Sequence, residues 1–398
     1  MKIQRRSSGS NRRRRGAIVV LVLSVIAITF AFAAFTVDFG MIALTKAQMQ
    51  NAADSSAHAA VQEVARSFGP GREISVSDAE DIARARAVEV VANFRTGDEG
   101  STSAHETRDV RLGRRSWNEQ TQSWDEEWGL TPYNMAEVTV RRTAADTTAL
   151  PMSFAQFLGQ SHFDLEARSV SALYPGNGFE LDDPNSSSTI GVLPIALDLG
   201  SWNDLMEQIH DGVAHGYDDD YQWDDSGGVV VERSDMDDIP EISMYPDLNS
   251  GLAPGNRGTV DLGAAGNSTN DLKRQILYGL SAWDLSFFPD SKIAFDDEGA
   301  LYLNGDTGIS AGIQNALESI IGEVRAIPIF IEVTGQGNNT TYTIVKFVGV
   351  RIMDVRLSGG PRNRHLTVQP AVFNSRFVTR ANIPVAVDSI LTPPVAIH

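Results

Sequence analysis

The sequence contains no cysteine, which excludes disulfide frameworks, thiolate metal sites and cysteine nucleophiles. Motifs of common enzyme classes are also missing. There is no His-Glu-x-x-His pair, no Gly-x-Ser-x-Gly elbow, no phosphate-binding Gly-Lys-Ser loop and no dinucleotide fingerprint. We therefore expect a non-enzymatic protein without a cofactor and without an evident small-molecule substrate.

Basic residues are few beyond the first fifteen positions. The chain has 33 Lys and Arg against 51 Asp and Glu, a formal net charge of −18. Residues 1–15 hold Lys or Arg at seven positions and no acid, so the rest of the chain is more acidic than this total. An acidic body does not bind nucleic acid by neutralising phosphates. The basic tail can contact anionic lipid headgroups.

Charge is absent from Gly16 to Val37. As a helix this run is roughly 33 Å long, enough to cross the hydrocarbon core of a bilayer. Asp38 is the next charged residue and would lie at the far interface. The excess of positive charge at Arg12, Arg13, Arg14 and Arg15 places the N-terminus in the cytoplasm. The sequence therefore predicts a single-pass protein of the inner (cytoplasmic) membrane, with a periplasmic or extracellular body.

A cleavable signal peptide is the alternative to a retained anchor. Ala31-Phe32-Ala33 resembles a cleavage site after a basic and an apolar region. The apolar run is longer than a usual signal peptide, however, no Pro or Gly interrupts it before this site, and apolar residues continue beyond it. We expect a retained anchor; a mature chain beginning at Ala34 would show cleavage.

Proline is also absent before Pro70, so the helix is expected to continue from residue 16 to residue 68. Its part beyond Asp38 is rich in alanine. Small side chains allow a close approach to a partner helix, as in helix pairs within membranes. The same face could instead fold back onto the chain's own body, and both interpretations stay open.

Three motifs follow one another in this helix: Arg15-Gly16-Ala17, Val37-Asp38-Phe39-Gly40, and Gln48-Met49-Gln50-Asn51-Ala52-Ala53-Asp54. In this order they resemble the N-terminal region of TadE/TadG-like proteins of the Flp (tight-adherence) pilus assembly system. The resemblance implies a component of a pilus assembly or secretion apparatus, with other Tad or pseudopilin-like proteins as partners. It also implies topology or packing roles for Gly16, Asp38, Gln48, Asn51 and Asp54.

One departure narrows the resemblance to the TadG type. Prepilin-like members have a peptidase site in which a Glu follows the Gly by five residues. That position is Leu21 here, and no Glu occurs before Glu63. Processing by a prepilin peptidase is therefore not expected.

The remainder predicts an α+β fold with a mixed, strand-rich body. We expect a helix over 77–94 with Ser77 as its N-cap and a breaker-rich linker formed by residues 175–178 and 182–188. A loop is expected over 212–228 and several strands between 327 and 372. The predicted divisions are a basic cytoplasmic tail (1–15), a transmembrane helix (16–37), a TadG-like region (38–175) and an acidic C-terminal domain (176–398).

Clustered carboxylates in the acidic loop raise the question of calcium. Asp218, Asp220 and Asp224 are weak candidates, because an EF-hand starting at Asp218 would place Trp223 at the obligatory Gly and Val229 at the obligatory Glu. A solvated loop is the preferred interpretation. The alternative function is a secreted or surface adhesin that binds through calcium, and a third is an envelope hydrolase without a recognisable motif.

Overall fold

The computed structural model describes residues 12–72, 74–183, 185–212, 216–232, 237–244, 257–263, 268–306, 308–335, 340–360 and 363–397. The chain divides into two compact units. Unit 1 comprises the residues up to Ser56 together with Ala87–Val110 and Val138–Ser169, and unit 2 comprises the rest. The boundary expected near residue 175 stays a prediction. The predicted tail up to residue 11 lies outside the described residues.

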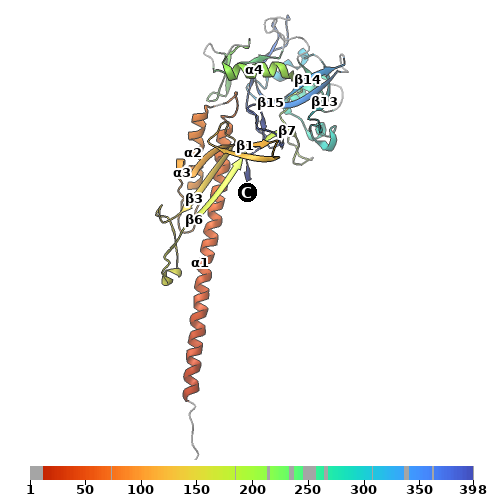
Figure 1. Cartoon of the computed structure of the whole chain (residues 1–398). Coiled ribbons are helices and arrows are strands. Elements are labelled where there is room, and N and C mark those ends of the chain that lie inside the picture. Colours follow the sequence, from red (N-terminus) through yellow and green to blue (C-terminus); the bar gives the residue numbers. More distant parts are fainter. Residues whose placement is uncertain are drawn as a thin grey trace, which may run out of the picture. The chain divides into compact units, whose positions relative to one another are not determined.

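Helix α1 (Arg12–Ala65) is one unbroken helix, as expected from a segment without proline (Figure 1). Its apolar side chains before Asp38 are largely exposed, with values such as 64% for Leu21 and 71% for Phe30. Within the described part of the chain, it alone is long and apolar enough to cross a membrane. The predicted order, a long apolar helix followed by a strand-rich α+β body, is confirmed.

Unit 1 packs the second half of α1 against short stretches of other elements. Small or flexible residues of α1, including Met49, Ala52 and Ala53, are fully buried there. Alternating residues Val138 and Val140 of strand β3 (Met135–Arg142) are also buried. The alanine face of α1, represented here by Ala52 and Ala53, is thus covered by the chain's own body. This agrees with the interpretation that the helix folds back onto its own chain.

Helix α2 (Val76–Ala92) confirms the predicted second helix but not its cap. The backbone N–H of Asp78 donates to Oγ of Ser75 at 3.0 Å, so Ser75 fills the capping role expected for Ser77. A serine followed three residues later by an acid satisfies the capping pattern at either position. Only the actual start of the helix selects between them.

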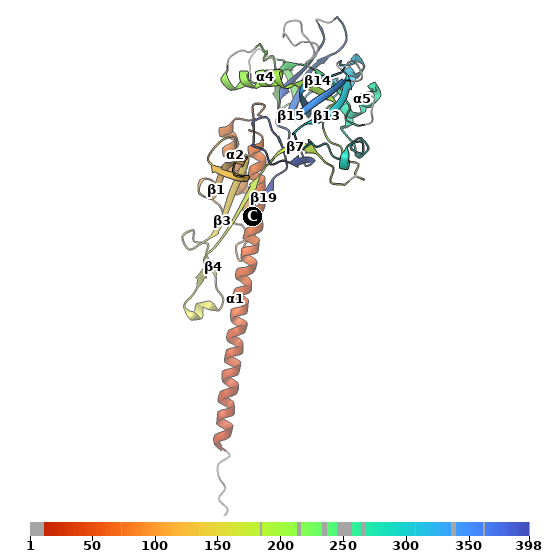
Figure 2. The same ribbon diagram turned by 45° about the vertical axis from the view of Figure 1, so that its right-hand side comes forward.

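Unit 2 contains a ring of paired strands. Strand β15 (Thr340–Arg356) pairs with both β13 (Leu301–Asp306) and β14 (Val324–Thr334), and the order β15-β13-β12-β8-β14 returns to β15. Figure 2 shows β13, β14 and β15 side by side. The closing contact is parallel: Ile329 and Phe330 of β14 pair with Leu197 and Asp198 of β8 (Ile195–Asp198). Closure removes the exposed edges that an open sheet would present.

Two segments expected to be irregular are strands. Pro175–Phe179 forms β7, which pairs with β17 and β18 instead of serving as a linker. A Cβ on Gly176 or Gly178 would lie 2.1 Å from Val378 or 2.2 Å from the Ile293 carbonyl oxygen, so these glycines permit close strand packing. The loop expected over 212–228 contains β9 (Tyr221–Asp224), paired with β10 (Val229–Glu232).

The other helices and strands also follow mixed α+β order. Their bounds are α3 Glu106–Asp109, β1 Val110–Asn118, β2 Ser123–Trp128, β4 Leu150–Pro151, η1 Ala155–Leu158, β5 His162–Phe163, β6 Leu165–Ala172, α4 Leu199–Asp211, β11 Ile242–Ser243, β12 Arg257–Val260, α5 Thr269–Tyr278, α6 Ala282–Leu285, η2 Pro289–Ser291, η3 Ala311–Ile313, α7 Gln314–Glu318, β16 His365–Pro370, β17 Val378–Arg380, β18 Ile390–Leu391 and β19 Val395–Ile397.

Candidate functional site

Asp38, the first charged residue after the apolar run, binds a loop far along the chain. We name residues 152–163 the aromatic loop. One carboxylate oxygen of Asp38 accepts the backbone N–H of Ser153 at 2.9 Å, and the other accepts that of Ala155 at 2.6 Å. The N–H of Phe154 lies within 3.2 Å of both oxygens. The side chain is only 5% exposed, so its desolvation is offset by charge-assisted hydrogen bonds.

Local chemistry explains why the aromatic loop turns back on itself. Strand β4 enters it and pairs with β5, which leaves it, through Leu150 with Phe163 and Pro151 with His162. Between them, the short helix η1 ends at Gly159, whose φ of 92° lies in the left-handed region that favours glycine. The loop therefore returns to its starting point and presents its tip beside α1.

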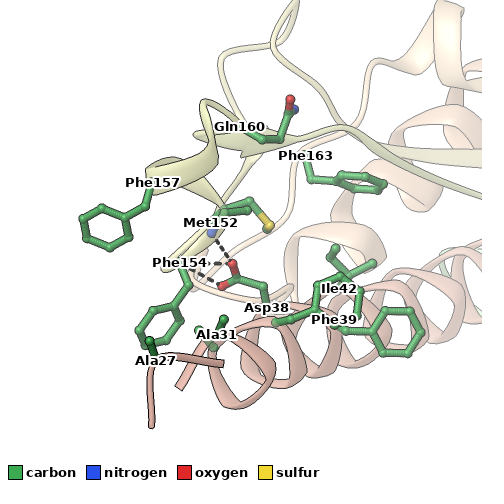
Figure 3. Close-up of a pocket in the computed structure, with 13 residues that line it drawn as sticks. Ala27, Ala31, Asp38, Phe39, Ile42, Met152, Phe154, Phe157, Gln160 and Phe163 are labelled. Carbon is green, nitrogen blue, oxygen red and sulfur yellow. Dashed lines mark hydrogen bonds between the residues drawn. The ribbon is translucent and has the colours of Figure 1, made fainter. Parts of the chain in front are cut away.

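The aromatic loop exposes three phenylalanines: Phe154 and Phe157 lie toward its tip, and Phe163 lies at its base, in β5. Phe157 is 81% exposed, and Phe154 and Phe163 are 42% and 40% exposed. Together with α1 residues these rings line a cavity of about 510 Å³ (Figure 3). Figure 3 shows Phe154 toward Ala27 and Ala31, and Phe157 extending away from the helix. Except for Asp38 and Gln160, the lining is apolar.

The base of the loop is held by Arg142, which is 2% exposed. Its guanidinium donates to the carbonyl oxygens of Thr148 and Thr96 at 2.7 and 2.6 Å and pairs with Asp98 at 2.8 Å. One side chain thus ties the segment that enters the aromatic loop to the turn at 96–98. This planar fork of donors is specific to arginine.

The motif residue Gln48 binds the same turn: its Oε1 accepts the N–H of Gly97 at 2.7 Å. Asp54 accepts a hydrogen bond from Gln50 at 2.9 Å, and the Asn51 side chain is exposed. The helix carries Arg12, Arg13, Arg14, Arg15 and Gly16, but their side chains lie outside what the structure describes. Asp38 and Gln48 each bind a distant segment of unit 1, and the expected topology and packing roles of the motif residues stay predictions.

The weak calcium candidates have ordinary local partners. Asp224 accepts hydrogen bonds from the N–H and hydroxyl of Ser226 within its own turn. The N–H of Asp220 donates to Glu241, and the carbonyl oxygen of Asp218 accepts the N–H of Glu241. In the described ranges, no three Asp, Glu or His side chains gather as a metal site would require. Calcium binding stays an untested alternative.

Comparison with known proteins identifies the N-terminal segment. Residues 16–63 match the Tad family model, described as Flp pilus-assembly TadE/G-like. The match covers most of α1, including Asp38 and Gln48, and confirms the resemblance read from the sequence. No curated protein and no solved structure matches the chain.

Sequence reasoning did not identify the partners of the motif residues. Nothing local in residues 150–159 shows that their backbone binds Asp38. The available signal is that no Asp, Glu, Lys or Arg occurs from Thr147 to Phe163 in an otherwise acidic body. No feature of the sequence marks Arg142 as buried, since its local pattern is the same as that of an exposed arginine in an amphipathic strand.

Asp38→Asn should loosen the aromatic loop. The substitution removes the negative charge and leaves one carbonyl oxygen where two carboxylate oxygens accept three N–H groups. Amide exchange at Ser153, Phe154 and Ala155 should accelerate roughly tenfold or more, because hydrogen bonds to charged groups are the stronger ones. Hydrogen exchange with mass spectrometry measures this change. Asn51→Ala, an exposed site on the same helix, is the control, and equal exchange in both variants would contradict the role of Asp38.

Proposed function

We propose that this protein is a non-enzymatic, single-pass membrane component of a Flp/Tad-type pilus assembly or secretion apparatus. The observation that carries the proposal is the position of the family match. It falls on a helix whose apolar half is uncovered and whose second half contains buried residues such as Met49, Ala52 and Ala53. Such a helix suits a protein that fixes a water-facing body to a membrane.

The proposed orientation places the N-terminus in the cytoplasm and the body outside the inner membrane. Four consecutive arginines precede the apolar run, and the body beyond it is acidic, which supports this topology. The proposed partners are other Tad or pseudopilin-like proteins. Because the alanine face of α1 is already covered within the chain, partners would use its exposed surface, which includes Leu44 and Asn51.

Membrane fractionation tests the anchor. The full chain should remain in the pellet after a carbonate wash, whereas Val22→Arg combined with Ile26→Arg should release it. Each charge at the centre of a span costs about 2.5–3.5 kcal/mol on insertion scales. Asn51→Arg with Ser55→Arg, exposed positions beyond the span, is the matched control. A wild-type chain released by the wash, or a mature chain beginning at Ala34, would contradict the anchor.

A deletion strain tests the assembly role. Loss of the gene should abolish surface pili without lowering pilin abundance, and the full chain should restore them. Restoration by a chain that carries the two span arginines would show that assembly does not need the anchor.

A further inference from the structure

We propose that the aromatic loop inserts its phenylalanines into the outer leaflet of the membrane that α1 crosses, so that the chain holds this membrane at two points. The inference rests on the anchor proposed above. The occupant of the cavity between the loop and α1 is then the acyl region of the surrounding lipid.

Depth along α1 is the first argument. Phe154 lies beside Ala27 and Ala31, and Ala27 precedes Asp38 by about 16 Å along the helix axis. If the bilayer ended below Ala27, the helix from Arg12 to Ile26 would offer only about 22 Å, against a hydrocarbon core of about 30 Å. A helix that spans the bilayer therefore brings the ring of Phe154 into the outer leaflet.

Side-chain chemistry is the second argument. The segment from Thr147 to Phe163 contains no Asp, Glu, Lys or Arg, and its one histidine is His162. Toward its tip it exposes Phe154 and Phe157 in a body that is otherwise strongly acidic. Phenylalanine on the apolar face of a segment that lies at the boundary between headgroups and acyl chains is typical of interfacial binding. An apolar surface that lies beside a membrane-spanning helix favours insertion to the depth of the membrane interface.

Backbone hydrogen bonding is the third argument, because lipid offers no partners to polar groups. Asp38 accepts the N–H groups of Ser153, Phe154 and Ala155. The N–H groups of Met152, Phe157, Gly159 and Gln160 bind carbonyl oxygens of the loop itself. The amides of Gln156 and Gln160 also donate to loop carbonyl oxygens, those of Ser153 and His162. Asp38 and the loop together thus provide partners for seven backbone N–H groups of the loop, even though its conformation is irregular.

The absence of cysteine makes a direct test possible. Phe157→Cys is labelled with an environment-sensitive fluorophore in the full chain, which is reconstituted into phospholipid vesicles at low protein density. Nitroxide groups placed on the lipid acyl chains should quench this label. The label at Asn51→Cys, on the part of α1 beyond the bilayer, should not be quenched. Quenching equal to that at Asn51 would overturn the inference.

Two further variants keep the outcomes separate. A label at Val25→Cys, in the middle of the apolar run, reports on the anchor alone. If it is not quenched, the anchor fails, whereas quenching at Val25 without quenching at Phe157 defeats only the loop insertion. Adding Phe154→Ser to the Phe157→Cys chain should weaken loop insertion roughly tenfold, as expected from the loss of one buried aromatic ring.

A second copy of the chain could shield the label instead of lipid. Quenching at Phe157 by the lipid nitroxides should then be low at high protein density and should rise as the protein-to-lipid ratio is lowered. That result would overturn lipid as the occupant. Quenching that is unchanged on dilution supports insertion.

Discussion

Replacing Arg142 by methionine is expected to lower the free energy of unfolding of unit 1 by about 3–5 kcal/mol. The side chain is 2% exposed and binds two carbonyl oxygens and Asp98. Methionine fills similar volume but leaves the carbonyl oxygens of Thr96 and Thr148 without these donors. The loss should be largest at the base of the aromatic loop.

Hydrogen exchange in the full chain, held in detergent micelles, measures this change in the segments 94–98 and 146–150. Arg95→Met is the matched control, since it removes the same charge and only one exposed hydrogen bond, to the Gly97 carbonyl oxygen at 3.1 Å, from the same turn. An exposed residue of this kind should change stability by less than about 1 kcal/mol. Equal effects of the two substitutions would contradict the role assigned to Arg142.

The second large effect concerns pH and unit 2. Burial, together with the negative charges of Asp219 and Asp237, raises the pKa of Glu241 to about 8, even though the N–H donors of Asp220 and Tyr221 act to lower it. Burial and the neighbouring charges of Asp219 and Asp238 likewise raise the pKa of Asp237, to about 6. Gln369 donates to both carboxyl groups at 3.3 Å.

The sign follows from proton binding. Between the usual glutamate pKa and the raised one, the folded protein binds a proton that the unfolded chain does not. The stability contribution is complete below about pH 4.5 and is lost as pH rises through about 8. We expect the free energy of unfolding of unit 2 to fall by about 3 kcal/mol between pH 5 and pH 8.5.

Glu241→Gln should flatten this slope, because it removes the group that titrates. Denaturant unfolding across the pH range measures it, with Glu298→Gln, an exposed carboxyl, as the control. Asp109 and Asp284 have lowered pKa values despite burial, since arginine partners and other donors outweigh it. Their contributions to stability are lost only in acid, as the pH falls toward their lowered pKa values. They stay constant between pH 5 and pH 8.5. A slope retained in Glu241→Gln would contradict the assignment.

The sequence could predict those parts of the candidate site that depend on local patterns. The apolar run, its arginine flank and the motif around Asp38 are local patterns, and they predicted the helix and its family. The aromatic loop was visible only as a stretch without charge. Its contact with Asp38 joins residues more than a hundred positions apart, and nothing in either segment specifies the other.

The sequence by itself determined the long helix, because a run without proline leaves no place to end it, and most strands, because β-branched residues favour extended backbone. It also determined the sign of charge on each side of the apolar run. Only the tertiary structure decided that Asp38 serves a distant loop, that β8 closes the strand ring on β14, that Gly176 and Gly178 belong to a strand, and that the alanine face is covered by its own chain. Hydrogen bonds and close packing between distant segments depend on how the whole chain folds. The local composition of either segment does not specify that fold.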